Sequence, residues 1–288
     1  DPAIIRPGRV EIHIEINNLD KDARQYFLDK VIENKPTSGS FDIKKLLMYT
    51  TGFTGSQLEM LGKEASYYCL RHGFPAITQD ILIDQINTIK YGERQSYLSL
   101  EQMFEETSVY EAGRAVISKT LMPHVSIEHV SLTPRDNNEH FISHNYSDVQ
   151  ENMTVKDFKD KICVSLAGRA AQIKYFGEIE GMDSGASNDL QQATRDAYAA
   201  IAHYGMDKEV GYININGVLD AQQKSVGNKD TQHYHEKIDT ALECWMLEGE
   251  KNVTALVNEQ WSRIEHLSKL LLEKEIIYED ELDQILTQ

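Results

Sequence analysis

Cysteine is scarce in this sequence. The chain of 288 residues has 3 cysteines, Cys69, Cys163 and Cys244, and no two of them form a C-x-x-C pair. Isolated cysteines of this kind suit a reducing compartment and buried thiols better than disulfides or a thiolate metal site. Long apolar runs are also missing, because no stretch approaches the roughly 20 residues that cross a bilayer. The chain opens at Asp1 in the middle of a motif, so we expect it to be a fragment of a longer chain.

Positive charge is in short supply as well. The sequence has 29 Lys and Arg against 46 Asp and Glu, which gives a formal net charge of -17. This balance argues against a nucleic-acid partner and against adhesion to an anionic membrane surface. The G-x-x-x-x-G-K-[ST] phosphate loop is absent, so we do not expect this chain to bind ATP unaided. What is present is a hydrophobic content of 41%, ample for the buried cores of about two domains.

The first motif places two arginines around a Pro-Gly turn. Arg6 and Arg9 lie in the run D-P-A-I-I-R-P-G-R-V-E, and planar guanidinium groups of this kind can neutralise charge on a transferring phosphoryl group. The run resembles the second region of homology of AAA+ ATPases, D-P-A-L-x-R-P-G-R-F-D. The resemblance implies that residues 1–13 end an ATPase core and that both arginines act as fingers on the ATP of a neighbouring subunit. Val10 and Glu11 depart from the pattern.

A block of four helices follows. Apolar spacing, capping residues and glycine stops predict helices over residues 21–33, 41–49, 56–71 and 79–90, joined by short loops. The run T-G-F-T-G-S-Q-L that begins at Thr51 resembles an element of the AAA+ helical lid. We therefore assign residues 14–92 to a lid subdomain and place a boundary at the polar, glycine-led stretch that begins at Gly92.

The helix predicted over residues 107–116 carries the central motif. Zinc peptidases use H-E-x-x-H, in which two imidazoles four residues apart bind the metal and the glutamate acts as base. In this sequence the corresponding pentamer is Tyr110-Glu111-Ala112-Gly113-Arg114. A phenol with a pKa of about 10 is a poor zinc ligand, and a guanidinium has no lone pair to give. Glu111 keeps the position of the base, but we expect it to be idle.

Further motifs connect this helix to one family. The chain contains L-A-G-R-A-A from Leu166, S-G-A-S-N-D-L from Ser184 and Y-G-M from Tyr204. Together with the lid and the E-A-G helix, these runs resemble FtsH, a membrane-anchored, ATP-dependent zinc metalloprotease. The resemblance implies that residues 93–288 form a mostly α-helical peptidase domain with a small β element. The expected fold is therefore mainly α.

The resemblance also assigns Asp189 the position of the third zinc ligand. Ser187 is predicted to cap the next helix, which places Asp189 in its first turn. The family's second-shell glutamate position has become Gln172-Ile173. With both imidazoles gone, we predict that Arg114 takes the electrostatic place of the metal and pairs with Glu111, Asp189 or both. The alternative is that Arg114 extends to solvent.

The histidines offer a weaker alternative metal site. His140 and His144 lie on a predicted strand, where residues four apart are over about 13 Å apart, too far to share a metal. His233 and His235 are interpreted as a solvated helix start. His129 is interpreted as a surface residue of a strand.

The sequence leaves three alternative functions for this chain. The first is a ring-forming unfoldase or scaffold, by analogy a hexamer, whose peptidase domain has lost zinc and proteolytic activity. The second is an active ATP-dependent zinc endopeptidase. The third is a regulatory subunit in a mixed ring with intact paralogues. In each case the full chain is expected to use ATP and Mg²⁺, to act on protein substrates, and to be held at the inner or plasma membrane by an N-terminal segment, with this part on the cytoplasmic side.

Overall fold

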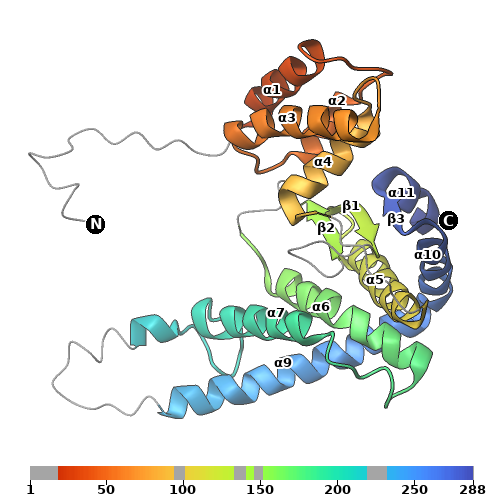
Figure 1. Ribbon diagram of the computed structural model, residues 1–288. Helices are drawn as coiled ribbons and strands as arrows, with labels where there is room; N and C mark the ends of the chain where they lie inside the picture. Colours follow the sequence, from red (N-terminus) through yellow and green to blue (C-terminus); the bar gives the residue numbers. More distant parts are fainter. Residues whose placement is uncertain (1–18, 94–100, 133–140, 146–151, 219–231, 288) are drawn as a thin grey trace, which may run out of the picture. The chain divides into compact units, whose positions relative to one another are not determined.

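The computed structural model describes residues 19–93, 101–132, 141–145, 152–218 and 232–287 (Figure 1). Contacts divide the chain into two compact units, Asp1–Gly92 and Glu93–Gln288. Helices dominate both units, which confirms the prediction of a mainly α fold. None of the helices in the described ranges is long and apolar enough to cross a bilayer. Arg6 and Arg9 lie outside the described residues.

The first unit contains the four predicted helices. They are α1 (Lys21–Glu33), α2 (Ile43–Tyr49), α3 (Gly55–His72) and α4 (Gln79–Tyr91). Side-chain oxygens of Asp20 and Thr78 cap α1 and α4. Helix α2 begins two residues later than predicted, because the Asp42 carboxylate accepts a hydrogen bond from the Lys45 amide and so caps the helix there.

The same unit closes around a small apolar core. Helix α3 starts with a capping box and ends at Gly73, whose φ of 73° is the left-handed conformation that glycine adopts without strain. The inward faces of the four helices supply the core side chains, which include Leu28, Leu46, Leu58, Leu61, Leu82 and Ile86. Burial of these side chains supplies the main favourable term for folding of this unit.

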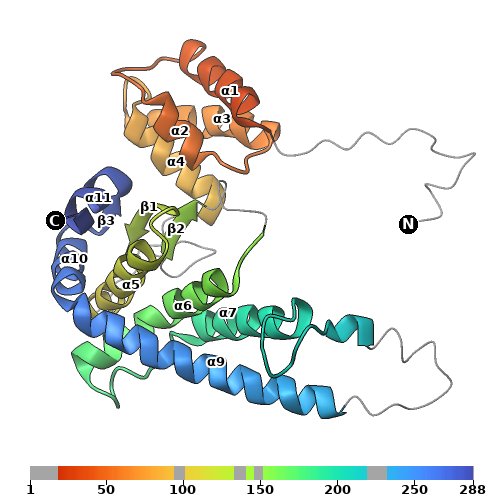
Figure 2. The ribbon, with the colours of Figure 1, turned by 180° about the vertical axis from the view of Figure 1, so that it is seen from behind.

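The second unit surrounds a long central helix with further helices and one small sheet. Its elements are α5 (Glu101–Leu121), β1 (Ser126–Ser131), β2 (Phe141–Asn145), α6 (Val155–Phe176), α7 (Ser187–Tyr198), the π-helical turn η1 (Ala199–His203), α9 (Gln232–Glu259), α10 (Trp261–Lys274), β3 (Ile276–Tyr278) and α11 (Glu279–Thr287). Figure 2 shows α9 running along α6 and α7, while α10 packs against α5. The last two elements, β3 and α11, were not predicted from the sequence.

The sheet corrects one prediction. Its strand order is β2-β1-β3, with both pairings antiparallel. His129 was expected at the surface, but only 1% of it is exposed. The reason is that β1 is the central strand and is covered on both faces, so that its residues are buried from Ile127 onward instead of alternating.

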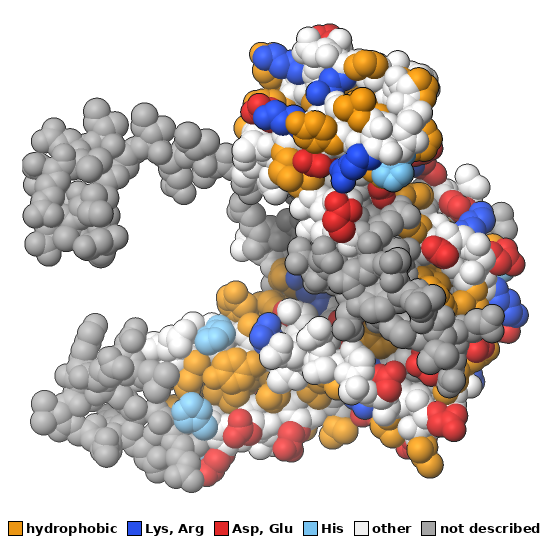
Figure 3. Space-filling view, in the orientation of Figure 1, with side chains coloured by type: hydrophobic (Ala, Val, Ile, Leu, Met, Phe, Trp, Pro, Cys, Tyr) orange, Lys and Arg blue, Asp and Glu red, His pale blue; other side chains and the backbone are white. Residues whose placement is uncertain are grey.

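Charge is dispersed over the surface. In the face drawn in Figure 3, red carboxylates and blue cations are interspersed over the described residues of both units, with no continuous blue area. This face therefore offers no basic patch of the kind that binds a nucleic-acid backbone.

Candidate functional site

Helix α5 buries the altered zinc motif. Its apolar residues Val109, Ala112, Ala115 and Val116 pack into the core of the second unit. Tyr110 and Glu111 are also buried, and only 1% of Glu111 is exposed. Arg114 follows one turn later, with 18% of its side chain exposed. The motif is thus an interior feature of the domain, held by the packing of α5 against α6, α10 and β1.

Helix α7 supplies the fourth side chain of the site. Ser187 was predicted to cap this helix, but the N-cap position is Ala186, which has no side-chain cap bond, and Ser187 is the first helical residue. Asp189 still falls in the first turn, as predicted. Its carboxylate is favoured there by the exposed amide groups of the helix start. The fold therefore brings the carboxylates of α5 and α7 to one site.

Arg114 lies between these two carboxylates. Its Nη1 is 3.3 Å from Oε2 of Glu111 and forms a hydrogen bond with it. Its Nε is 3.3 Å from Oδ2 of Asp189. The predicted ion pair is present, and it engages both carboxylates, whereas a guanidinium that extended fully into solvent would engage neither. An internal cation therefore stands at the point where the two acidic side chains converge.

Tyr110 is tied to the same carboxylate. Its hydroxyl donates a hydrogen bond of 2.5 Å to Oδ2 of Asp189. Burial, followed by the neighbouring Asp189 carboxylate, raises the pKa of the Tyr110 phenol well above its ordinary value of about 10. The phenol is therefore neutral and acts as a donor. Only the phenolate could bind a metal, and this environment opposes its formation.

Glu111 is the most buried acid of the site. Burial, which is the largest cause, and the Asp189 carboxylate together raise the pKa of its carboxyl to about 7, although Arg114 acts in the opposite direction. The loss of hydration thus outweighs the attraction of Arg114. Near neutral pH the carboxyl is partly protonated, and its charged form depends on the guanidinium beside it.

Two glycines allow α5 and α6 to come close at the site. A Cβ atom on Gly168 would lie 2.6 Å from the ring of Tyr110, and one on Gly113 would lie 2.5 Å from the Cβ of Ala171. Both distances are too short for real contacts. The Tyr110 ring therefore lies directly on the backbone of α6, which fixes its hydroxyl against Asp189.

We expect Gly168→Ala to destabilise the domain by about 1–3 kcal/mol, because the added methyl group forces the buried Tyr110 ring to move. Urea unfolding of the purified chain measures the change. Gly217→Ala is the matched control, since no atom lies within 4 Å of a Cβ at that position. In the control the change should stay within about 1 kcal/mol. Equal effects of the two substitutions would contradict the contact.

Gln172, at the family's second-shell position, is buried on α6. Its Nε2 donates to the backbone oxygen of Glu106 at 3.5 Å and to Oδ2 of Asp183 at 3.4 Å. These bonds join α6 to the start of α5 and to the loop before α7. Gln172 therefore acts as a neutral link between these segments.

The residues present do not fit a zinc ion. Zinc in a peptidase takes imidazole and carboxylate ligands around one point. At the two imidazole positions this chain has the guanidinium of Arg114, which repels a cation, and the neutral phenol of Tyr110, which donates its proton to a hydrogen bond with Asp189. In the part of the chain that the structure describes, no group of three or more His, Cys, Asp or Glu side chains is arranged to hold a metal.

The remaining histidine predictions concern β2 and the start of α9. His144 lies on β2 opposite Ile127, as the strand prediction implied, and His140 lies outside the described residues. His233 and His235 are exposed in the first turns of α9, as expected for a solvated helix start.

From the sequence, Arg169 was given no separate attention. Arg169 was read only as part of the L-A-G-R-A-A motif, but the structure places it on the wall of an apolar groove next to α9. The signal that could have found it is an arginine in the middle of an otherwise small and apolar stretch of a helix.

Comparison with known proteins places the chain in a family. Residues 100–285 match peptidase family M41. The chain is 31% identical to ATP-dependent zinc metalloprotease FtsH 1 of Alkaliphilus metalliredigens over 99% of this chain and 47% of that protein. It is 30% identical to the FtsH of Thermus thermophilus, over 99% of this chain and 45% of that protein. The FtsH of Thermotoga maritima is 28% identical, over 100% of this chain and 48% of that protein.

The chain thus spans about half the length of the curated relatives it matches. The motifs that suggested the resemblance are spread over both units, and the relatives align with both. The protein belongs to peptidase family M41 and corresponds to the C-terminal part of an FtsH-type protein.

Proposed function

We propose that this chain is the C-terminal part of an ATP-driven, FtsH-type ring protein whose peptidase domain binds no zinc and cuts no peptides. One observation carries the proposal: the Arg114 guanidinium lies 3.3 Å from both Glu111 and Asp189. A fixed cation there opposes a divalent ion, and without a metal-bound water Glu111 has no nucleophile to activate. The domain's remaining role is structural, as the base of the ring and as a chamber for unfolded protein.

The full chain supplies the remaining parts of this proposal. Arg6 and Arg9 act on the ATP and Mg²⁺ of the next subunit in a hexamer, or in a mixed ring with intact paralogues. A segment outside this chain anchors the ring to the inner or plasma membrane, with this part on the cytoplasmic side, and the substrates are proteins. Of these parts, the relatives' printed names, ATP-dependent zinc metalloprotease, support the use of ATP.

The second candidate is an active zinc endopeptidase, favoured by the retention of Glu111 and Asp189. Elemental analysis of the purified chain, combined with digestion of casein, separates the two. We expect substoichiometric zinc and no casein cleavage above the buffer control. One zinc per chain with cleavage that a chelator stops would overturn the proposal. Co-purification with an intact paralogue would identify the mixed ring.

A further inference from the structure

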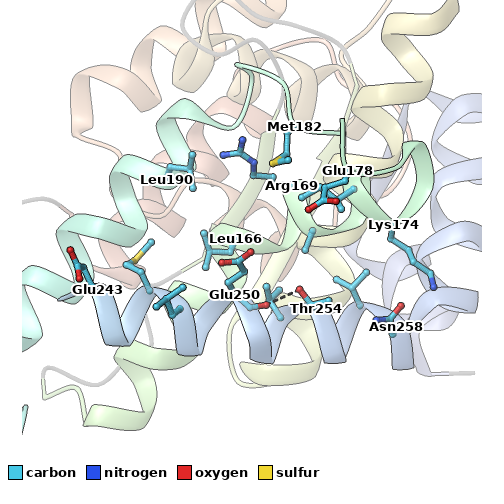
Figure 4. A pocket seen from close by; sticks show the side chains of 16 residues that line it. Leu166, Arg169, Lys174, Glu178, Met182, Leu190, Glu243, Glu250, Thr254 and Asn258 are labelled. Carbon is cyan, nitrogen blue, oxygen red and sulfur yellow. Dashed lines mark hydrogen bonds between the residues drawn. The ribbon is translucent and has the colours of Figure 1, made fainter. Parts of the chain in front are cut away.

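An open groove crosses the second unit, and none of its lining residues is Tyr110, Glu111, Arg114 or Asp189. It has a volume of about 930 Å³ and lies between α6, the segment that leads into α7, and α9 (Figure 4). Its lining on α9 runs from Glu243 to Asn258, which is roughly 22 Å at 1.5 Å per residue. A trough of this length is open along its side and suits a stretch of polypeptide better than a small molecule.

The groove is apolar, and part of its apolar lining is exposed. The floor is formed by side chains of three helices, among them Leu166, Ile173, Leu190, Met246, Val253 and Val257. Leu247 on its wall is 66% exposed, and Met182 opposite is also exposed. Exposed apolar side chains that gather along one trough are typical of a surface that a partner covers.

Arg169 gives the groove a specific polar feature. It is partly buried on α6, and Figure 4 shows its guanidinium between the side chains of Leu190 and Met182. Within the described ranges, no ion pair or hydrogen bond joins this side chain to an acidic residue. A guanidinium among apolar side chains gains most from a carboxylate, which it can bind through two parallel hydrogen bonds.

The opposite wall has the opposite charge. Glu243 and Glu250 line the groove from α9, and both are exposed. A segment lying in the groove therefore meets Arg169 and Lys174 along α6, Glu178 just beyond the end of α6, and the two anions along α9. This arrangement selects by charge as well as by apolar contact.

We propose that this groove binds an amphipathic helix of a partner protein. The apolar stripe of the helix faces the groove floor, a carboxylate on one edge pairs with Arg169, and basic side chains on the other edge face Glu243 and Glu250. The proposal is independent of whether the peptidase site is active, because no residue of the groove belongs to that site.

The test uses a synthetic peptide and a charge reversal. The probe is a fluorescein-labelled 18-residue helical peptide with leucines along one face, glutamates along one edge and lysines along the other. A second peptide has lysine in place of every glutamate. Fluorescence anisotropy is measured with the purified chain at about 150 mM salt, where interactions between distant exposed charges are screened.

We expect Arg169→Glu to weaken binding of the first peptide at least tenfold and to improve binding of the second. Arg195→Glu is the matched control, because Arg195 is exposed on α7 and does not line the groove. It should bind the first peptide as the parent chain does. Leu247→Asp should weaken the binding of both peptides. Circular dichroism checks that each variant is folded.

Several results would overturn the proposal. One is equal affinity of the first peptide for the parent chain and for Arg169→Glu, and another is no binding to the parent chain. A third is self-association of the chain that Arg169→Glu abolishes while the peptide does not compete, since the occupant would then be a second copy of this chain.

Discussion

The double substitution Tyr110→His, Arg114→His should raise the zinc content of the purified chain to about one ion per molecule. Both positions flank Glu111 on α5, and both side chains already reach Asp189 on α7. Two imidazoles four residues apart on one helix, together with the Asp189 carboxylate, would restore three protein ligands and remove the opposing cation. Elemental analysis after dialysis measures the gain.

The controls test whether zinc binding requires all three ligands or follows from adding any histidine. Each single substitution should leave the zinc content close to that of the parent chain, because either the guanidinium or the phenol is still in place. Adding Asp189→Asn to the double variant should remove most of the zinc again, since the third ligand is lost. A double variant with no more zinc than the parent would show that the pocket has lost the geometry of a metal site altogether.

Arg114→Met should reduce the free energy of unfolding by about 1–1.5 kcal/mol at pH 8, because the Glu111 carboxylate loses its cation and takes up a proton instead, and pH 8 lies only about one unit above its pKa of about 7. Methionine keeps the apolar contacts of the arginine side chain. The loss should be much smaller at pH 5. Urea unfolding of the full chain at both pH values measures the difference.

The pH dependence follows from the direction of the Glu111 shift. The pKa of this carboxyl in the folded protein, about 7, lies above its value in the unfolded chain. The contribution of such a group is fully present below the unfolded pKa and is lost as the pH rises through the folded pKa. Removing Arg114 raises the folded pKa further, so at pH 5 the carboxyl is neutral and the missing cation matters little.

Arg195→Met provides the comparison for this experiment. Arg195 is exposed on α7, so its loss should change stability by no more than about 0.5 kcal/mol at either pH. A loss for Arg114→Met that is equal at pH 5 and pH 8 would mean that packing, and not charge, accounts for the role of Arg114.

The arrangement shows how α5 and α7 can be connected through side chains of this chain alone. In the peptidase pattern, a divalent ion would hold α5 to α7 through its ligands. In this chain the guanidinium and the phenol make that connection, through contacts with Glu111 and Asp189. Buried carboxylates cannot lose a cation without an alternative partner, because their charge would be uncompensated. Arg114 satisfies this requirement within the chain itself.

Some predictions from the sequence were wrong for identifiable reasons. The reading of His129 as exposed assumed that β1 has one solvated face, but the strand is central and covered on both sides. Ser187 has a side chain typical of a cap, yet the backbone starts the helix one residue earlier. The strand β3 has only three residues, Ile276–Tyr278, too few for a periodic pattern to show.

By itself the sequence determined the family, the mainly α class and the loss of both imidazoles, because these depend on local spacing and on the chemistry of single side chains. Only the tertiary structure decided that Arg114 reaches Glu111 and Asp189 together. The same holds for the contact of Tyr110 with the backbone of Gly168 and for the position of Arg169 in the lining of an apolar groove. Each of these relations joins helices distant in the sequence. They are set by how closely the helices pack, which no pattern within one helix specifies.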